Sequence, residues 1–106
     1  MTHSYSWADV LGSLSAGTDL TEEQCRQAMS EIVEGRATSA QIAAFVMGLR
    51  VKGETASEVA GLVDAMLDHA EPLALERPAL DVVGTGGDLA DTVNISTISA
   101  IVAAAA

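Results

Sequence analysis

The stretch best suited to chemistry is a glycine-dense run late in the sequence. Residues 81–97 read Asp-Val-Val-Gly-Thr-Gly-Gly-Asp-Leu-Ala-Asp-Thr-Val-Asn-Ile-Ser-Thr. Glycine lets the backbone approach a ligand closely, so several N–H groups can converge on one anion. A helix that follows adds its unpaired N-terminal donors and the positive end of its dipole. The run therefore predicts a phosphate site that uses backbone amides in place of side-chain cations.

Two common phosphate-binding motifs do not fit these residues. A dinucleotide fingerprint needs Gly-x-Gly-x-x-Gly, and after Gly84 and Gly86 the third glycine position holds Leu89. A P-loop needs a Gly-Lys-Ser/Thr ending, but no lysine or arginine follows Arg77. An ordinary glycine-rich loop with an Asn or Ser helix cap explains each piece alone, but it does not explain the whole run.

Gly-Thr-Gly-Gly-Asp at 84–88, followed by Thr92 and by Asn-Ile-Ser-Thr at 94–97, resembles the anthranilate phosphoribosyltransferase family of tryptophan biosynthesis. The resemblance implies a pentosyltransferase, which moves phosphoribosyl from phosphoribosyl pyrophosphate to the amine of anthranilate and releases pyrophosphate. The leaving group is a polyanion whose charge grows as the bond breaks, so its stabilisation calls for preorganised donors and Mg²⁺.

The resemblance also implies roles for single residues. Gly84 would lie against both substrates, anthranilate included, and Ser96 would give a hydroxyl oxygen to Mg²⁺, which favours hard oxygen ligands. The implied substrate-binding residues are Gly84, Gly87, Asp88, Thr92, Asn94, Ile95, Ser96 and Thr97. Asn94 and Thr97 could equally cap the helix. Asp88 is unusual beside phosphate, because its carboxylate repels an anion.

Two positions depart from the common family pattern, and later parts of that pattern are absent. Leu89 stands where a glycine is common and makes positive φ costly, whereas Val93 is an apolar replacement for phenylalanine. The family's Lys-His-Gly-Asn segment, its acidic pair for Mg²⁺ and its anthranilate-contacting arginine would lie beyond Ala106. We therefore expect no catalytic residue here and no turnover by this polypeptide alone.

The elements that position this run begin with four segments of helical apolar spacing. Each has a capping-box start: Ser6 with Asp9, Thr21 with Gln24, Thr38 with Gln41, and Thr55 with Glu58. The apolar stripes comprise Trp7, Val10, Leu11, Leu14; Cys25, Ala28, Met29, Ile32, Val33; Ile42, Phe45, Val46, Leu49; and Val59, Leu62, Val63, Met66, Leu67. Glycines at 35 and 53 and a proline at 72 end the last three segments. The pattern predicts a bundle held by its stripes, because burying one large apolar side chain contributes about 1.5–3 kcal/mol and a cap about 1.

The expected fold is mostly α, with a four-helix N-terminal bundle and then the first strand-loop-helix of an α/β domain of the nucleoside phosphorylase/phosphoribosyltransferase type. The expected domains are residues 1–71 for the bundle, 72–79 for a linker with two prolines, and 80–106 for the incomplete α/β part. The strand has no visible partner and the final helix has no stop signal. We therefore expect an incomplete N-terminal part of a longer protein.

The composition of the chain limits the classes of partner that it could bind. A formal net charge of −10, from 15 acidic and 5 basic residues, argues against nucleic acid and anionic membranes. Cys25 is the only cysteine, which excludes an intrachain disulfide, suits the cytoplasm and fits a core position. No apolar run reaches membrane-spanning length. Arg50, Lys52 and His69 fall in last helical turns, where a structural role beside the helix dipole is preferred.

Several alternatives stay open. The family resemblance implies a homodimer through the helical domain, but a purely intramolecular core fits the sequence equally well. A pyrimidine nucleoside phosphorylase has a related fold and phosphate loop, although that loop usually lacks the complete Asn-Ile-Ser-Thr run. A non-catalytic helical interaction module is the third interpretation.

Overall fold

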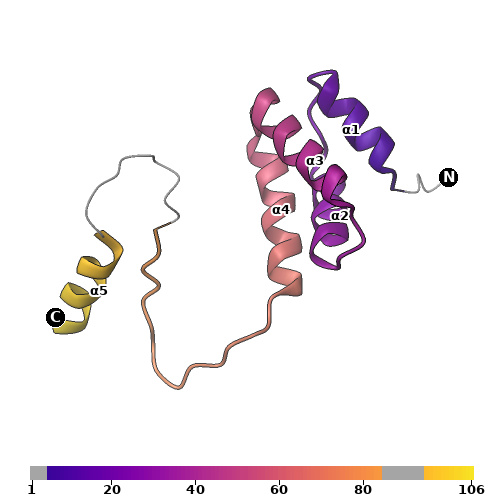
Figure 1. Ribbon diagram of the computed structural model, residues 1–106. Coiled ribbons are helices and arrows are strands. Elements are labelled where there is room, and N and C mark those ends of the chain that lie inside the picture. The colour runs from indigo at the N-terminus through magenta and orange to yellow at the C-terminus, as the bar shows by residue number, and fades with distance from the viewer. Residues whose placement is uncertain (1–4, 85–94) are drawn as a thin grey trace. The chain divides into compact units, whose positions relative to one another are not determined.

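The computed structural model describes residues 5–84 and 95–106, and it divides into two units, Met1–Pro72 and Leu73–Ala106 (Figure 1). The first unit holds four helices: α1 (Trp7–Ser15), α2 (Glu22–Val33), α3 (Ser39–Lys52) and α4 (Ala56–His69). The described part of the second unit holds α5 (Ile95–Ala105). The described residues are thus mostly helical, as predicted. None of their helices is long and apolar enough to cross a membrane.

Three of the four predicted capping boxes are confirmed. Thr21, Thr38 and Thr55 each accept a hydrogen bond from the backbone N–H three residues later, and the residue there accepts from the threonine N–H in return. Two backbone donors of each helix are satisfied in this way. The prediction for Ser6 is wrong, because its side chain makes no capping hydrogen bond. Its partner position holds Asp9, whose side chain is one methylene shorter than the Glu or Gln of a capping box.

Glycine ends α3 as the sequence predicts. Gly53 has φ 87° and donates its N–H to the carbonyl oxygen of Leu49 at 2.8 Å. A side chain at this φ would be strained, so glycine is the residue that lets the chain leave the helix here. Gly35 does the same after α2, with φ 73°.

The core of the first unit lies between two helix pairs, α1 with α3 and α2 with α4. Its buried apolar residues are Val10, Leu14, Leu20, Cys25, Ala28, Phe45 and Leu49. Trp7 packs its ring edge-on against Phe45, with ring centroids 5.8 Å apart. Most of the predicted inner positions of α1, α2 and α3 are therefore buried or half-buried, although Val33 and Val46 are exposed.

The apolar stripe predicted for α4 does not face the core as expected. Its larger apolar members are exposed, namely Val59, Val63, Met66 and Leu67, while Leu62 is half-buried. The buried positions are Glu58, Gly61 and Ala65. The reason is close helix packing: a Cβ at Gly61 would collide with the backbone carbonyl oxygen of Glu22. Small residues let the α4 and α2 backbones approach, and the large side chains of α4 then lie outside.

The predicted strand before the glycine run is not formed among the described residues. Residues 79–84 carry no regular secondary structure, so this expectation is wrong for the described chain. A strand is stabilised by hydrogen bonds to a neighbouring strand, and the described residues supply none. Helix α5 needs no such partner, because its backbone hydrogen bonds are internal.

Candidate functional site

Gly84 and Ser96 lie side by side in the second unit. A Cβ built on Gly84 would be 2.7 Å from the Ser96 Oγ. Gly84 is exposed at the end of the irregular segment, and Ser96 is half-buried in the first turn of α5. Two residues that the sequence assigns to one site are thus brought together from both sides of residues 85–94.

The remaining predicted site residues divide into two groups. Ile95 and Thr97 flank Ser96 in the first turn of α5, where both are exposed. Gly87, Asp88, Thr92 and Asn94 lie outside the described residues. The described part therefore offers a bare glycine backbone, two hydroxyls and the start of a helix, where the positive end of the helix dipole suits an anion.

The described residues offer one suitable ligand for Mg²⁺, the hydroxyl of Ser96. They contain no group of three or more His, Cys, Asp or Glu side chains placed to hold a metal ion. Protein sites for Mg²⁺ use few protein ligands and rely on waters and substrate phosphates. The half-buried Ser96 hydroxyl is a hard oxygen donor that meets this requirement.

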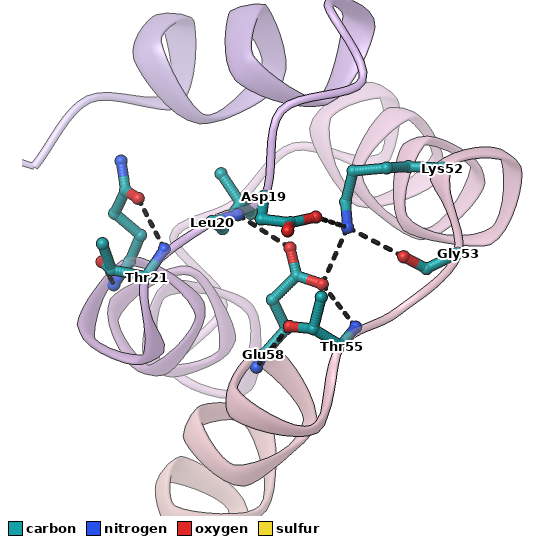
Figure 2. Close-up of polar contacts among 8 residues, drawn as sticks. Asp19, Leu20, Thr21, Lys52, Gly53, Thr55 and Glu58 are labelled. Carbon is teal, nitrogen blue, oxygen red and sulfur yellow. Dashed lines mark hydrogen bonds and ion pairs between the residues drawn. The ribbon is translucent and has the colours of Figure 1, made fainter.

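In the first unit, a buried carboxylate joins three segments (Figure 2). Glu58 is fully buried in the first turn of α4. Its Oε1 accepts a hydrogen bond from the Leu20 N–H at 2.8 Å, and its Oε2 accepts from the Thr55 N–H at 2.8 Å. The Nζ of Lys52 lies 2.9 Å from Oε2. Glu58 therefore connects the α1–α2 loop, the end of α3 and the start of α4.

Lys52 completes this cluster of charges. Its Nζ also lies 2.8 Å from the Asp19 Oδ1, and it donates to the Gly53 carbonyl oxygen at 2.8 Å. Only 5% of the Lys52 side chain is exposed. All three ammonium donors are used within the protein. The structural role preferred for Lys52 is confirmed, and the same holds for His69, whose Nδ1 lies 2.7 Å from the Ala65 carbonyl oxygen.

The cluster sets the protonation of both of its buried members. Burial, the largest single effect, raises the pKa of Glu58, but the hydrogen bonds from Thr55, Leu20 and Lys52 together outweigh it and leave that pKa below its usual 4.5. Hydrogen bonds to Asp19 and then to Glu58 raise the pKa of Lys52 above 10.5. Both side chains are charged at neutral pH.

Sequence reasoning missed the tertiary role of Glu58. The Thr-x-x-Glu spacing predicts the helix cap, and a cap occupies one carboxylate oxygen. The other oxygen bonds to Leu20, 38 positions earlier in the chain. The one available signal was a lysine in the last turn of the preceding helix, because a glutamate and a lysine on either side of a tight connection can pair.

Cys25 is a core residue, as predicted. Its side chain is fully buried and forms no disulfide. Burial, and secondarily the charge of Glu58, raises the pKa of the thiol to about 11. At neutral pH the group is a neutral thiol and a poor nucleophile.

Comparison with known proteins agrees with the division of the chain. Residues 8–70 match the family model described as "Glycosyl transferase family, helical bundle domain", and residues 76–106 match the model described as "Glycosyl transferase family, a/b domain". The first of these matches covers more than half of the chain.

Relatives named anthranilate phosphoribosyltransferase align with nearly the whole chain. The protein of Saccharopolyspora erythraea is 55% identical over 101 residues, which are 95% of this chain and 29% of the relative. That of Nocardioides is 56% identical over 95% of this chain and 30% of the relative, and that of Leifsonia xyli is 53% identical over 100% of this chain and 30% of the relative. The chain thus spans about three tenths of the length of these relatives. It belongs to the glycosyl transferase family whose helical bundle and a/b domains the two models describe.

Proposed function

We propose that this chain forms the N-terminal part of an anthranilate phosphoribosyltransferase and contributes to its phosphoribosyl pyrophosphate site. The supporting observation is the order of the two family matches along the chain, together with the name shared by relatives that are 53–56% identical. The reaction joins the anthranilate amine to the anomeric carbon of phosphoribosyl pyrophosphate and releases pyrophosphate. We place the protein in the cytoplasm, where both substrates would be met.

The proposed domains are residues 1–71 for the helical bundle, 72–79 for the linker and 80–106 for the start of the α/β domain. In the α/β part, the substrate pyrophosphate would rest on backbone N–H groups around Gly84 and Gly87 and at the start of α5. Asn94, Thr92 and Thr97 would donate side-chain hydrogen bonds to the phosphates. The Ile95 backbone would add to the same surface, and Asp88 would accept from a ribose hydroxyl.

Ser96 would hold Mg²⁺ through its hydroxyl, with substrate phosphates and waters as the other ligands. When bound, the ion neutralises charge that develops on the pyrophosphate leaving group. Neutral protein donors suit this arrangement, because they bind the anion before and after the bond breaks without needing a proton transfer. Anthranilate would approach on the side of Gly84.

The activity test is direct. The full-length protein is expected to consume anthranilate, measured as loss of its fluorescence, in the presence of phosphoribosyl pyrophosphate and Mg²⁺. Omitting each component in turn is the control. Phosphorolysis of thymidine without loss of anthranilate would instead identify a pyrimidine nucleoside phosphorylase. The absence of both reactions would favour a non-catalytic helical module.

Ser96→Ala tests the proposed metal ligand. Calorimetric titration of the full-length protein with phosphoribosyl pyrophosphate, at several Mg²⁺ concentrations, should give weaker and less Mg²⁺-dependent binding for the variant. Ser99→Ala is the matched control, because Ser99 lies on the same helix and is exposed. Equal titration curves for Ser96→Ala and the unaltered protein would remove Ser96 from the metal site.

We also propose a homodimer through the helical domain. Two apolar surfaces support it: Val46, Met47 and Val51 on α3, and Val59, Val63, Met66 and Leu67 on α4, all 44–80% exposed. Helix α3 also buries Phe45 and Leu49, so it is apolar on both sides, which is typical of a helix covered all round. Light scattering on Met47→Glu and Met66→Glu variants of the full-length protein would assign the surface. A monomer mass for the unaltered protein would reject the dimer.

A further inference from the structure

Glycine is needed at position 84 for a reason other than backbone conformation. Among the described glycines, Gly17, Gly35 and Gly53 have positive φ, and a Cβ on any of them would meet no atom within 4 Å. Gly84 is the opposite case. Its φ lies outside the left-handed region, but a Cβ on it would meet Ser96. An L residue could adopt a φ in this range, so the space beside Gly84 is the constraint that the described residues show.

The atom that fills this space is the Ser96 hydroxyl oxygen. A Cβ on Gly84 would lie 2.7 Å from the Ser96 Oγ, closer than non-bonded carbon and oxygen atoms approach, but 4.0 Å from the Ser96 Cβ, an ordinary contact distance. Among the described residues, the conflict thus involves one rotatable hydroxyl and no backbone atom. An alanine at position 84 would be accommodated by turning Ser96 to another χ1 rotamer, which moves Oγ without disturbing α5.

We propose that Gly84 is a positioning residue for Ser96: its missing side chain leaves the space that the Ser96 hydroxyl occupies, and any larger residue would turn that hydroxyl away. The inference rests on the proposed function, in which that hydroxyl binds Mg²⁺. A metal ligand must be held in its productive direction by its neighbours, and loss of such support typically reduces metal affinity by about 10–100-fold. Gly84 contributes by leaving the productive direction of the hydroxyl open, which a side chain at this position would block.

The experiment is a double-mutant cycle in the full-length protein, with Gly84→Ala, Ser96→Ala and the double variant. Calorimetric titration with phosphoribosyl pyrophosphate at low and saturating Mg²⁺ gives the first readout. Gly84→Ala is expected to weaken Mg²⁺-dependent binding about tenfold, the lower end of the range for neighbours of metal ligands. When it is added to the Ser96→Ala variant, the same change should have no further effect, because the atom it displaces is absent.

A direct clash between the methyl group added at position 84 and the substrate predicts something different. The methyl group would then weaken binding by the same factor whether Ser96 is present or replaced by alanine. That additive result would overturn the proposal.

Melting of the ligand-free proteins gives a second readout, which is independent of substrate and metal. Glycine to alanine at a compatible φ stabilises a protein by restricting the unfolded chain. Gly84→Ala should therefore raise the melting temperature more when it is added to the Ser96→Ala variant than when it is made in the unaltered protein. Equal shifts in the two cases would overturn the steric premise. A coupled shift in melting, with unaltered Mg²⁺ dependence in Ser96→Ala, would keep the steric contact but refute Ser96 as the metal ligand and Gly84 as its support.

Discussion

The two units of this chain differ in how far their apolar residues are buried. In Met1–Pro72, seven apolar side chains form one buried cluster. In the described part of Leu73–Ala106, no residue is buried, and Leu73, Leu80, Ile98 and Ile101 are 53–81% exposed. Helix α5 carries no charged residue and is mostly apolar, which is typical of a helix buried in a larger core. The bundle therefore holds its own structure, whereas the second unit needs further protein around it.

The largest expected effect is a difference in thermal unfolding between the two units when each is made as a separate polypeptide. A polypeptide of residues 1–72 should unfold in one cooperative thermal transition, because its core is complete. A polypeptide of residues 73–106 should show no cooperative transition, because it has no buried core to lose. Circular dichroism at 222 nm during heating measures both. Cooperative melting of the second polypeptide would break the comparison.

Within the bundle, Glu58→Ala should have the largest effect of a single substitution. The change leaves the buried Leu20 N–H and the Lys52 ammonium without their shared partner. Removing one member of a buried ion pair typically costs about 3–5 kcal/mol of unfolding free energy. Urea denaturation of the 1–72 polypeptide measures this loss. Glu54→Ala, at an exposed glutamate just before α4, is the control and should change the midpoint little.

Gly61→Ala should have a smaller but clear effect. The added methyl would meet the Glu22 carbonyl oxygen, so α4 and α2 must move apart at their closest approach. Overpacking of this kind costs about 1–3 kcal/mol. Gly12→Ala is the matched control: it also lies within a helix, and nothing lies within 4 Å of its added Cβ. The control should stabilise the bundle by about 0.5–1 kcal/mol, so the two substitutions should differ in sign. Stabilisation by both would contradict the close packing of α2 and α4.

The smallest effect concerns pH. The pKa of Glu58 is lower in the folded protein than its usual 4.5, so the folded state binds fewer protons than the unfolded state in that range. The contribution of Glu58 is therefore present above pH 4.5 and is lost as the pH falls through the lower folded value. The melting temperature should fall more steeply with acid in the unaltered bundle than in Glu58→Gln. Parallel curves would show that the Glu58 carboxylate is not stabilised by folding.

The contribution of Lys52 to stability changes with pH in the opposite direction. Its pKa is raised above 10.5, so its contribution is present below pH 10.5 and is lost as the pH rises through the raised value. The melting temperature of the original bundle should therefore fall as the pH rises above 10.5, and it should fall less in Lys52→Met. Equal pH dependence of the two melting temperatures would contradict the pairing of Lys52 with Asp19 and Glu58.

Local sequence signals predicted what depends on local contacts. The three Thr-x-x-Gln/Glu boxes were correct, because donor and acceptor lie three residues apart and form as the helix forms. The inward face of α4 was wrong, because a hydrophobic stripe does not reveal that Gly61 meets the backbone of another helix. The bond from Glu58 to Leu20 was missed for the same reason. Both depend on which helix lies opposite, and that is a property of the tertiary fold.

The candidate site rests on its family motif more than on physical reasoning, and the roles of its residues stay predictions. The motif assigns Gly84 and Ser96 to one site, and in the structure a Cβ on Gly84 would lie 2.7 Å from the Ser96 Oγ. Spacing alone could not have given this proximity, because it is a property of the tertiary fold. The roles of Gly87, Asp88, Thr92 and Asn94 stay predictions, because these residues lie outside the described part of the chain.

Because Cys25 is buried, its reactivity can report local opening of the bundle. A thiol with no exposed surface and a pKa of about 11 reacts with maleimide only when α2 separates from its neighbours. The labelling rate at neutral pH then measures how often the native helices part, with no probe introduced by mutation. Since the chain has no second cysteine, each modified molecule records one such event.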